Sequence, residues 1–184
     1  MPDGGAALNG SDPLEIETFC PSPETARAYR TALGSFGTGV TIVTCMDASA
    51  PLAMTANSFS SVSLDPPLVL WSPAITSSRH DAFVAAKHFS IHVLSKAQLK
   101  LAFAFAKDGR DFSHVAWEAG ENGAPALPGS VTRFDCVHHA AHGAGDHTIV
   151  LGRVERACHT PSAPLLFWGG AYGTFAERDF TTGG

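Results

Sequence analysis

Runs of β-branched and apolar residues, separated by short polar connections, recur along the chain from residue 39 onward. Residues 39–45 are rich in β-branched side chains, and residues 52–57 follow after a short connection, which predicts a hairpin. Residues 58–64 alternate between polar and apolar positions, a proline pair interrupts the pattern, and residues 68–71 resume it as an apolar run. This spacing predicts a second pair of strands joined by a proline turn.

Helical spacing occurs before and between the strands. Ser22 is a good N-cap residue, a proline and an acid follow it, and apolar residues then recur at Ala28, Ala32 and Phe36, so a helix is predicted to begin there. Two more helices are predicted over 79–87 and 96–107. Further strands are predicted over 89–94, 131–138, 148–157 and 165–168, with 139–147 as a connection and 108–129 as a long surface loop.

The order of these elements indicates the fold class. Many strands follow one another with only a few helices between them, and strands and helices do not alternate regularly. This order favours a mainly β protein built as a closed antiparallel barrel over a doubly wound sheet. No Gly-x-Gly-x-x-Gly motif follows a predicted strand, so the usual dinucleotide fold is not indicated.

Composition and charge narrow the class of protein. The chain has 184 residues with 45% hydrophobic content, so we expect one domain over 23–176 between a disordered tail, 1–22, and a short tail, 177–184. A formal net charge of −5 argues against nucleic acid as a partner. The longest apolar run of the chain is far shorter than the roughly 20 residues that cross a bilayer. Residues 1–20 resemble neither a secretion signal nor an anchor. Four widely spaced cysteines are expected to be free thiols in a reducing cytoplasm.

The densest polar cluster in a strand-like region is the stretch 55–63, Thr-Ala-Asn-Ser-Phe-Ser-Ser-Val-Ser. Small hydroxyl and amide side chains suit a neutral site for a phosphate or for the edge of a flavin ring. The same composition also fits an ordinary half-exposed strand, so by itself it does not decide between the two.

Several histidines gather near one connection, at His138, His139, His142 and His147. Neighbouring residues of a strand point to opposite faces, and no cysteine or carboxylate completes a recognisable ligand spacing. We therefore expect no metal site.

Five segments in order resemble the short-chain flavin reductase family: GTGVTIVTC, MTANSFSSVSLDPPLVL, HFSIHVL, GDHTIVLGRV and PLLFWGGAYG. The resemblance covers residues 29–175 and implies an FMN-binding split β-barrel, antiparallel and Greek-key-like. This family supplies the reductase component of two-component flavin-dependent monooxygenases. The sequence departs from the family pattern at His92, where asparagine is frequent, at Ser60, where threonine is frequent, and in the histidine-rich stretch 138–145.

The resemblance also implies a function. The protein is expected to reduce FMN or FAD with NADH or NADPH, by hydride transfer from C4 of the nicotinamide to N5 of the flavin, and to supply reduced flavin to a partner monooxygenase. A homodimer is expected. Two alternatives stay open: a split barrel with tightly bound FMN that oxidises or reduces an organic substrate, and a non-catalytic module that binds flavin or haem.

Site residues follow from the resemblance position by position. Contacts to the isoalloxazine ring and ribityl chain are implied for Met54, Thr55, Asn57 and Ser58, and a border of the same cofactor for Ser72, Pro73 and Ala74. Ser78 and Arg79 face the flavin phosphate, and Phe105 lies on the phosphate or adenine side. His147 is implied beside flavin and nicotinamide as the catalytic residue, with Gly170 and Tyr172 at the nicotinamide.

Each of these positions has a structural alternative. Phe105 has the spacing of a core residue, and Arg79 could be an ordinary surface arginine. His147 could serve only to tie down its loop through Asp146, and the segment GGAYG could be a plain hairpin turn.

Overall fold

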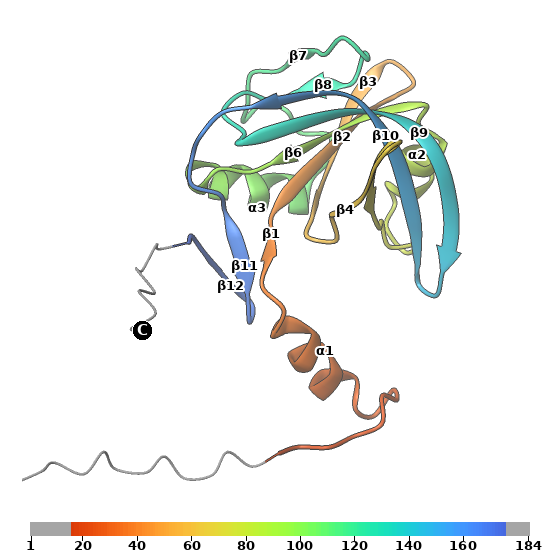
Figure 1. Cartoon of the computed structure of the whole chain (residues 1–184), viewed down its shortest axis with the longest axis vertical. Helices are drawn as coiled ribbons and strands as arrows, with labels where there is room; N and C mark the ends of the chain where they lie inside the picture. Colours follow the sequence, from red (N-terminus) through yellow and green to blue (C-terminus); the bar gives the residue numbers. More distant parts are fainter. Residues whose placement is uncertain (1–15, 176–184) are drawn as a thin grey trace, which may run out of the picture. The chain divides into compact units, whose positions relative to one another are not determined.

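The computed structural model describes residues 16–175 of the chain (Figure 1). The predicted tails 1–22 and 177–184 lie outside the described residues except for 16–22, which contain no helix or strand. The chain divides into two compact units, one ending at Leu33 and the other beginning at Gly34. No helix among residues 16–175 is long and apolar enough to cross a membrane.

Helix α1, Ala26–Gly34, begins later than predicted, and all of it except its last residue belongs to the first unit. The hydroxyl group of Thr25 donates to the carbonyl oxygen of Cys20 at 2.8 Å and accepts the N–H of Ser22 at 2.8 Å. Ser22 donates its own hydroxyl to Glu24. The polar residues expected to cap the helix therefore form a turn before it.

The second unit is built on a seven-stranded sheet in which every neighbouring pair is antiparallel. This confirms the predicted mainly β, antiparallel fold. The strand order is β3-β2-β6-β9-β10-β5-β4 (Figure 1). The strands are β2 Thr41–Asp47, β3 Ala50–Ala56, β4 Ser60–Leu64, β5 Pro67–Trp71, β6 His88–Val93, β9 Thr132–Ala144 and β10 His147–His159.

A small second sheet has the order β1-β11-β12. Its strands are β1 Thr38–Gly39, β11 Leu166–Trp168 and β12 Ala171–Gly173. Strand β12 was not predicted. It follows a turn in which Gly169 and Gly170 both have positive φ, 58° and 84°, a conformation that glycine adopts without steric cost.

The helices of this unit agree with the prediction. Helix α2 is His80–Ala85, and the segment expected over 96–107 consists of a 3₁₀ turn, η1 Lys96–Gln98, followed by α3 Leu99–Lys107. The Ser95 side chain accepts from the helix start while Gln98 reaches back to the backbone N–H of Ser95 at 3.0 Å.

Two connections differ from the prediction. The histidine-rich stretch 139–147 is mostly strand, because β9 and β10 pair up to Ala144 and His147 and leave a two-residue turn at Gly145 and Asp146. The segment 108–129 is not simply a surface loop. It contains strands β7 Glu118–Ala119 and β8 Pro125–Ala126, and it buries Ala124, Ala126 and Leu127.

The main apolar core lies on one face of the sheet, around Trp71. The Trp71 indole meets the ring of Phe83 edge to face, with centroids 5.1 Å apart, and Phe89 at 6.5 Å. Gly152 allows this packing, because a Cβ at that position would lie 2.5 Å from Cζ of Phe89. A second cluster under α3 includes Ile42, Leu101 and Phe105.

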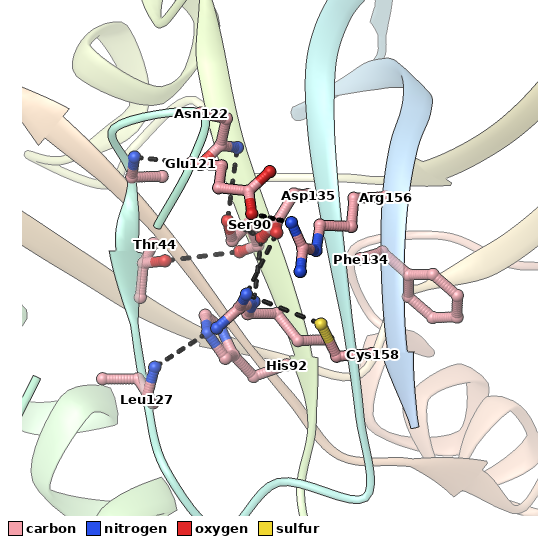
Figure 2. Close-up of polar contacts among 12 residues, drawn as sticks. Thr44, Ser90, His92, Glu121, Asn122, Leu127, Phe134, Asp135, Arg156 and Cys158 are labelled. Carbon is pink, nitrogen blue, oxygen red and sulfur yellow. Dashed lines mark hydrogen bonds and ion pairs between the residues drawn. The ribbon is translucent and has the colours of Figure 1, made fainter. Parts of the chain in front are cut away.

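The opposite face of the sheet carries a polar layer, which we define as Thr44, Ser90, His92, Arg133 and Asp135. All but the partly exposed Arg133 are buried, and those four are labelled in Figure 2. Strand register makes cross-strand neighbours of Thr44, Ser90 and Asp135, and likewise of His92 and Arg133. Such a layer is stable only if its donors and acceptors are paired.

The cover segment, residues 116–128, provides part of that pairing (Figure 2). Thr44 donates its hydroxyl to the carbonyl oxygen of Pro125 at 2.6 Å, and Asn122 donates to the carbonyl of Phe89 at 3.2 Å. The backbone N–H of Leu127 donates to Nε2 of His92 at 3.1 Å. Because Nε2 accepts a hydrogen bond, it carries no proton, so His92 is neutral and its Nδ1–H donates to the carbonyl oxygen of Ile42 at 3.1 Å.

The neutral state of His92 makes stability depend on pH. Complete burial lowers the pKa of His92 from 6.5 to about 4, although the Ile42 carbonyl opposes the change. The unfolded chain therefore takes up a proton that the folded protein excludes. The free energy of unfolding should fall by about 3 kcal/mol as pH drops from 6.5 towards 4, at about 1.4 kcal/mol per pH unit. Urea denaturation across this pH range measures the loss.

A His92→Asn variant carries no group that titrates in this range and can keep the donor to the Ile42 carbonyl, because its amide lies where Nδ1 does; it should lose most of this pH dependence. His139→Asn, at an exposed position of β9, is the matched control and should keep it. Equal pH slopes in the two variants would contradict the assignment to His92.

Candidate active site

A pocket of about 190 Å³ lies where β3, the end of α3 and the small sheet meet. We call it the Tyr172 pocket. It brings together three residues that the sequence placed in a site, Thr55, Asn57 and Tyr172. The other lining residues are Val40, Ala56, Ala106 and Phe167.

The walls of the Tyr172 pocket are held in place by packing and hydrogen bonding. The ring of Tyr172 contacts Phe103 edge to face and Phe167 at an angle, each with centroids 5.0 Å apart. The Thr55 hydroxyl donates to the carbonyl oxygen of Ala102 on α3 at 2.7 Å. Asn57 is exposed, and its amide remains available to a ligand. A fixed aromatic ring beside an open amide suits a flat, polar-edged molecule.

The segment 72–79, which we call the site loop, joins further predicted residues. The N–H of Ser72 donates to Oγ of Ser58 at 2.9 Å. The carbonyl of Pro73 accepts the N–H of Thr148 at 3.1 Å, and Ala74 forms an isolated antiparallel bridge with His147. The structure therefore places Ser58, the start of the site loop and His147 in one connected group.

His147 opens the β10 strand with its side chain 43% exposed. Its Nδ1 lies 2.7 Å from Oδ1 of Asp146, and this hydrogen bond, together with the charge of His147, lowers the pKa of the Asp146 carboxyl. The bond fixes the ring orientation and leaves Nε2 as the nitrogen that can meet a ligand.

Arg79 is bound to the protein itself. Its Nη1 donates to the carbonyl oxygens of Ala53 at 3.0 Å and Phe105 at 2.6 Å, and Nη2 donates to that of Ala106 at 3.3 Å. Two of these carbonyls lie in the last turn of α3, where helix acceptors lack partners and a cation is favourable. Burial lowers the pKa of Arg79, which still leaves a guanidinium charged at neutral pH.

Gly109 makes the position of Arg79 possible. A Cβ at residue 109 would lie 2.1 Å from the carbonyl oxygen of Ala53 and 2.7 Å from Cδ and Nη1 of Arg79. Only the Nε–H and one N–H of Nη2 remain for a ligand. The neighbouring Ser78 is exposed.

Two predicted residues have side chains directed into packing. Met54 is 7% exposed within the Trp71 core, and Phe105 is fully buried with its ring 4.8 Å from that of Phe112. Phe105 matches its core-packing alternative, and only its carbonyl reaches the site, through Arg79. Gly170 lies in the exposed turn before Tyr172.

Sequence reasoning missed His80. Its Nε2 lies 2.8 Å from Oγ1 of Thr148 and its Nδ1 lies 2.8 Å from Oδ1 of Asp81, with the side chain 13% exposed. Together with the bond from the N–H of Ile75 to the carbonyl of Asp146 at 2.9 Å, this clamps the site loop to β10. No local pattern signals such a contact across 68 residues of sequence.

The chemistry of the site is that of a neutral binding surface. Within residues 16–175 no group of three or more His, Cys, Asp and Glu side chains could hold a metal ion. Hydroxyl, amide and backbone donors, one oriented imidazole and a partly used guanidinium can bind a flat ring and a phosphate.

The chain is similar in sequence to known proteins. Residues 33–176 match the family profile described as "Flavin reductase like domain". The FMN reductase (NADH) SmoA of Agrobacterium fabrum is 54% identical over 160 residues, which cover 87% of this chain and 92% of that protein. The flavin-dependent monooxygenase reductase subunit HsaB of Mycobacterium tuberculosis is 36% identical over 160 residues, covering 85% of each.

A solved structure is also similar. The Streptomyces globisporus NADH:FAD oxidoreductase SgcE6 in complex with NAD and FAD fragments superimposes with a TM-score of 0.81 at 39% identity. The match covers 88% of this chain and 99% of that one.

The bonds of Arg79 generate a prediction about stability. Arg79→Ala leaves three carbonyl oxygens of β3 and α3 without this donor, so the free energy of unfolding should drop by about 2 to 4 kcal/mol. Arg110→Ala, which removes an exposed ion pair with Asp47, should cost less than about 1 kcal/mol. Urea denaturation at pH 7 compares them, and equal losses would show that Arg79 does not hold these segments together.

Proposed function

The chain belongs to the flavin reductase family, and on that premise we propose that it transfers a hydride from NADH to FMN or FAD and supplies the reduced flavin to a partner monooxygenase. One observation carries the proposal. Residues expected at the flavin, Thr55 and Asn57, and the residue expected at the nicotinamide, Tyr172, line the same pocket. Hydride transfer requires the two rings to meet face to face at about 3 to 3.5 Å.

The size of the Tyr172 pocket and the residues beside it fit one edge of a flavin. The Tyr172 pocket of about 190 Å³ is smaller than pockets that enclose a whole ligand of this size, roughly 300 to 1,000 Å³. It is therefore suited to one edge of the ring system, with the exposed Asn57 amide and the site loop beside it. Bound flavin and nicotinamide supply the redox chemistry themselves.

The protein's own residues bind and orient. The Tyr172 ring, in contact with Phe103 and Phe167, gives the pocket a rigid flat wall. Arg79 offers its remaining N–H donors to the flavin phosphate, next to Ser78. His147 presents Nε2 to the ligands, and its hydrogen bond to Asp146 holds the ring in this orientation.

We also propose a homodimer in the cytoplasm. On β5, Val69 and Trp71 point into the core, so the alternate residues Leu68 and Leu70 point outward. Leu151 of β10 is the cross-strand partner of Leu70 and lies on the same face. On the neighbouring strand β4, Val62 and Leu64 are also exposed, at 47% and 96%. Apolar faces of this kind mark protein interfaces, and sedimentation equilibrium of the wild type and of Leu70→Arg tests the proposed homodimer.

All four cysteines are free, which fits the reducing compartment of the proposed cytoplasmic location.

Turnover tests the proposed function directly. Purified protein freed of bound small molecules should consume NADH, followed at 340 nm, only when FMN or FAD is added. Consumption that needs no added flavin would indicate a tightly held cofactor. Failure with every flavin would overturn the reductase assignment and leave a flavin-binding module.

His147 is the residue whose replacement should affect the reaction most specifically. His147→Asn should lower kcat/KM for NADH by about tenfold while flavin binding changes little, because the imidazole is proposed to lie where the nicotinamide ring meets the flavin ring. His142→Asn, on the exposed part of the same hairpin, should behave as wild type. Identical kinetics in the two variants would return His147 to the role of tying down its turn.

A further inference from the structure

A second cavity lies between the cover segment and the sheet. It has a volume of about 290 Å³ and shares no lining residue with the Tyr172 pocket. We call it the Trp117 cavity. Its lining residues are Ala116, Trp117, Glu118, Ala126, Leu127, Pro128 and Arg133.

Of the two charged side chains in this cavity, Arg133 and Glu118, Arg133 is the hydrogen-bond donor, and its guanidinium is held firmly. Its Nε and Nη2 lie 3.0 and 3.2 Å from the two carboxylate oxygens of Asp135, and Nη2 lies 3.6 Å from Sγ of Cys158. Asp135 is 2% exposed and accepts the hydroxyl of Ser90 at 2.7 Å. The pair cannot swing out to water without breaking this network, so the fork stays where it is.

Part of the fork has no partner. Among residues 16–175 nothing accepts from Nη1, and Nε, although buried and close to Asp135, makes no aligned hydrogen bond. The Arg133 side chain is 20% exposed. Both N–H donors of Nη1 are therefore free of protein partners and can donate to an acceptor in the cavity that Arg133 lines.

Apart from Glu118, the rest of the cavity lining is apolar. Alanine, leucine and proline side chains form most of the wall. The Trp117 indole, 37% exposed, is fixed edge to face against Phe112 with centroids 5.8 Å apart. An immobile indole favours contact with a planar ring.

Charge selects among planar ligands. The Arg133 cation is already neutralised by Asp135, and Glu118 adds a negative charge to the lining. A carboxylate ligand would find no unbalanced positive charge, whereas a neutral carbonyl oxygen would accept from Nη1 without bringing a charge out of water.

We propose that the Trp117 cavity is a binding site for a neutral, planar aromatic molecule that carries a carbonyl oxygen. The ring packs between the Trp117 indole and the apolar wall, and the carbonyl accepts from Nη1 of Arg133. The volume, near the lower end for ligand pockets, limits the ligand to one or two rings. This site is independent of the proposed flavin chemistry.

The test uses the full chain and a fluorinated probe, 4-fluoroacetophenone, titrated by ¹⁹F NMR. We expect saturable binding. Two comparison probes isolate the chemistry: 1-ethyl-4-fluorobenzene has a similar shape but no acceptor, and 4-fluorobenzoate has an acceptor but carries a charge. Each should bind about tenfold more weakly or worse. Equal or tighter binding of either would overturn the proposed ligand class.

Two variants locate the binding. Ala116 is exposed at the rim of the cavity, so Ala116→Leu should block it without disturbing the core and should abolish binding of 4-fluoroacetophenone. Ala119→Leu, exposed on the neighbouring strand β7 but outside the lining, is the matched control and should bind as wild type. Binding that survives Ala116→Leu would place the probe elsewhere and overturn the site.

The role of the guanidinium is tested with its charge balance preserved. Arg133→Met alone would leave the buried Asp135 unpaired, so the double variant Arg133→Met with Asp135→Asn is used, with circular dichroism to verify its fold. It should bind 4-fluoroacetophenone no better than 1-ethyl-4-fluorobenzene. A retained preference for the ketone in the folded double variant would remove Arg133 from the site.

Discussion

Asp135 is a carboxylate with 2% of its surface exposed, and it requires partners that stay in place. Ser90 and Arg133 provide them from neighbouring positions on β6 and β9, which fixes the register of strands that also line the Trp71 core on their other face. The cover segment then completes the layer through Thr44, Asn122 and His92. One sheet thus separates an apolar interior from a polar one, and the polar interior constrains where each strand can lie.

The candidate site, like the polar layer, depends on hydrogen bonds between segments that are distant in sequence. No single segment contains it: β3, the site loop, the end of α3 and the β9–β10 turn each add a part. What holds these parts together is mostly backbone hydrogen bonding, as in the bonds of Pro73 and Asp146, reinforced by His80 and Arg79. A surface assembled from cross-linked loops can present donors to a ring and a phosphate with little rearrangement.

The strands of the barrel could be predicted because β-branched and apolar runs such as residues 39–45 carry a strong local signal. The cover segment could not, because its glycines, prolines and small residues are typical of loops, and its burial comes from backbone groups that satisfy Thr44 and His92. The extension of β9 was hidden for a similar reason, since alanine, histidine and glycine are poor strand formers that here follow an established ladder. At the candidate site, the family pattern predicted Thr55, Asn57 and Tyr172, which line one pocket, but it could not separate the side chain of Phe105 from its carbonyl.

Arg79 has a consequence for how long a ligand stays. Three N–H donors of its fork already bond to carbonyl oxygens, and Gly109 lets the backbone close around it. A phosphate that meets only the remaining donors is bound less tightly than one that meets a free, bidentate guanidinium. Weaker binding is expressed mainly as faster dissociation. In the proposed reaction the flavin must dissociate after it is reduced. An arginine that already donates most of its N–H groups to its own protein shortens the residence time of the flavin and so favours its release.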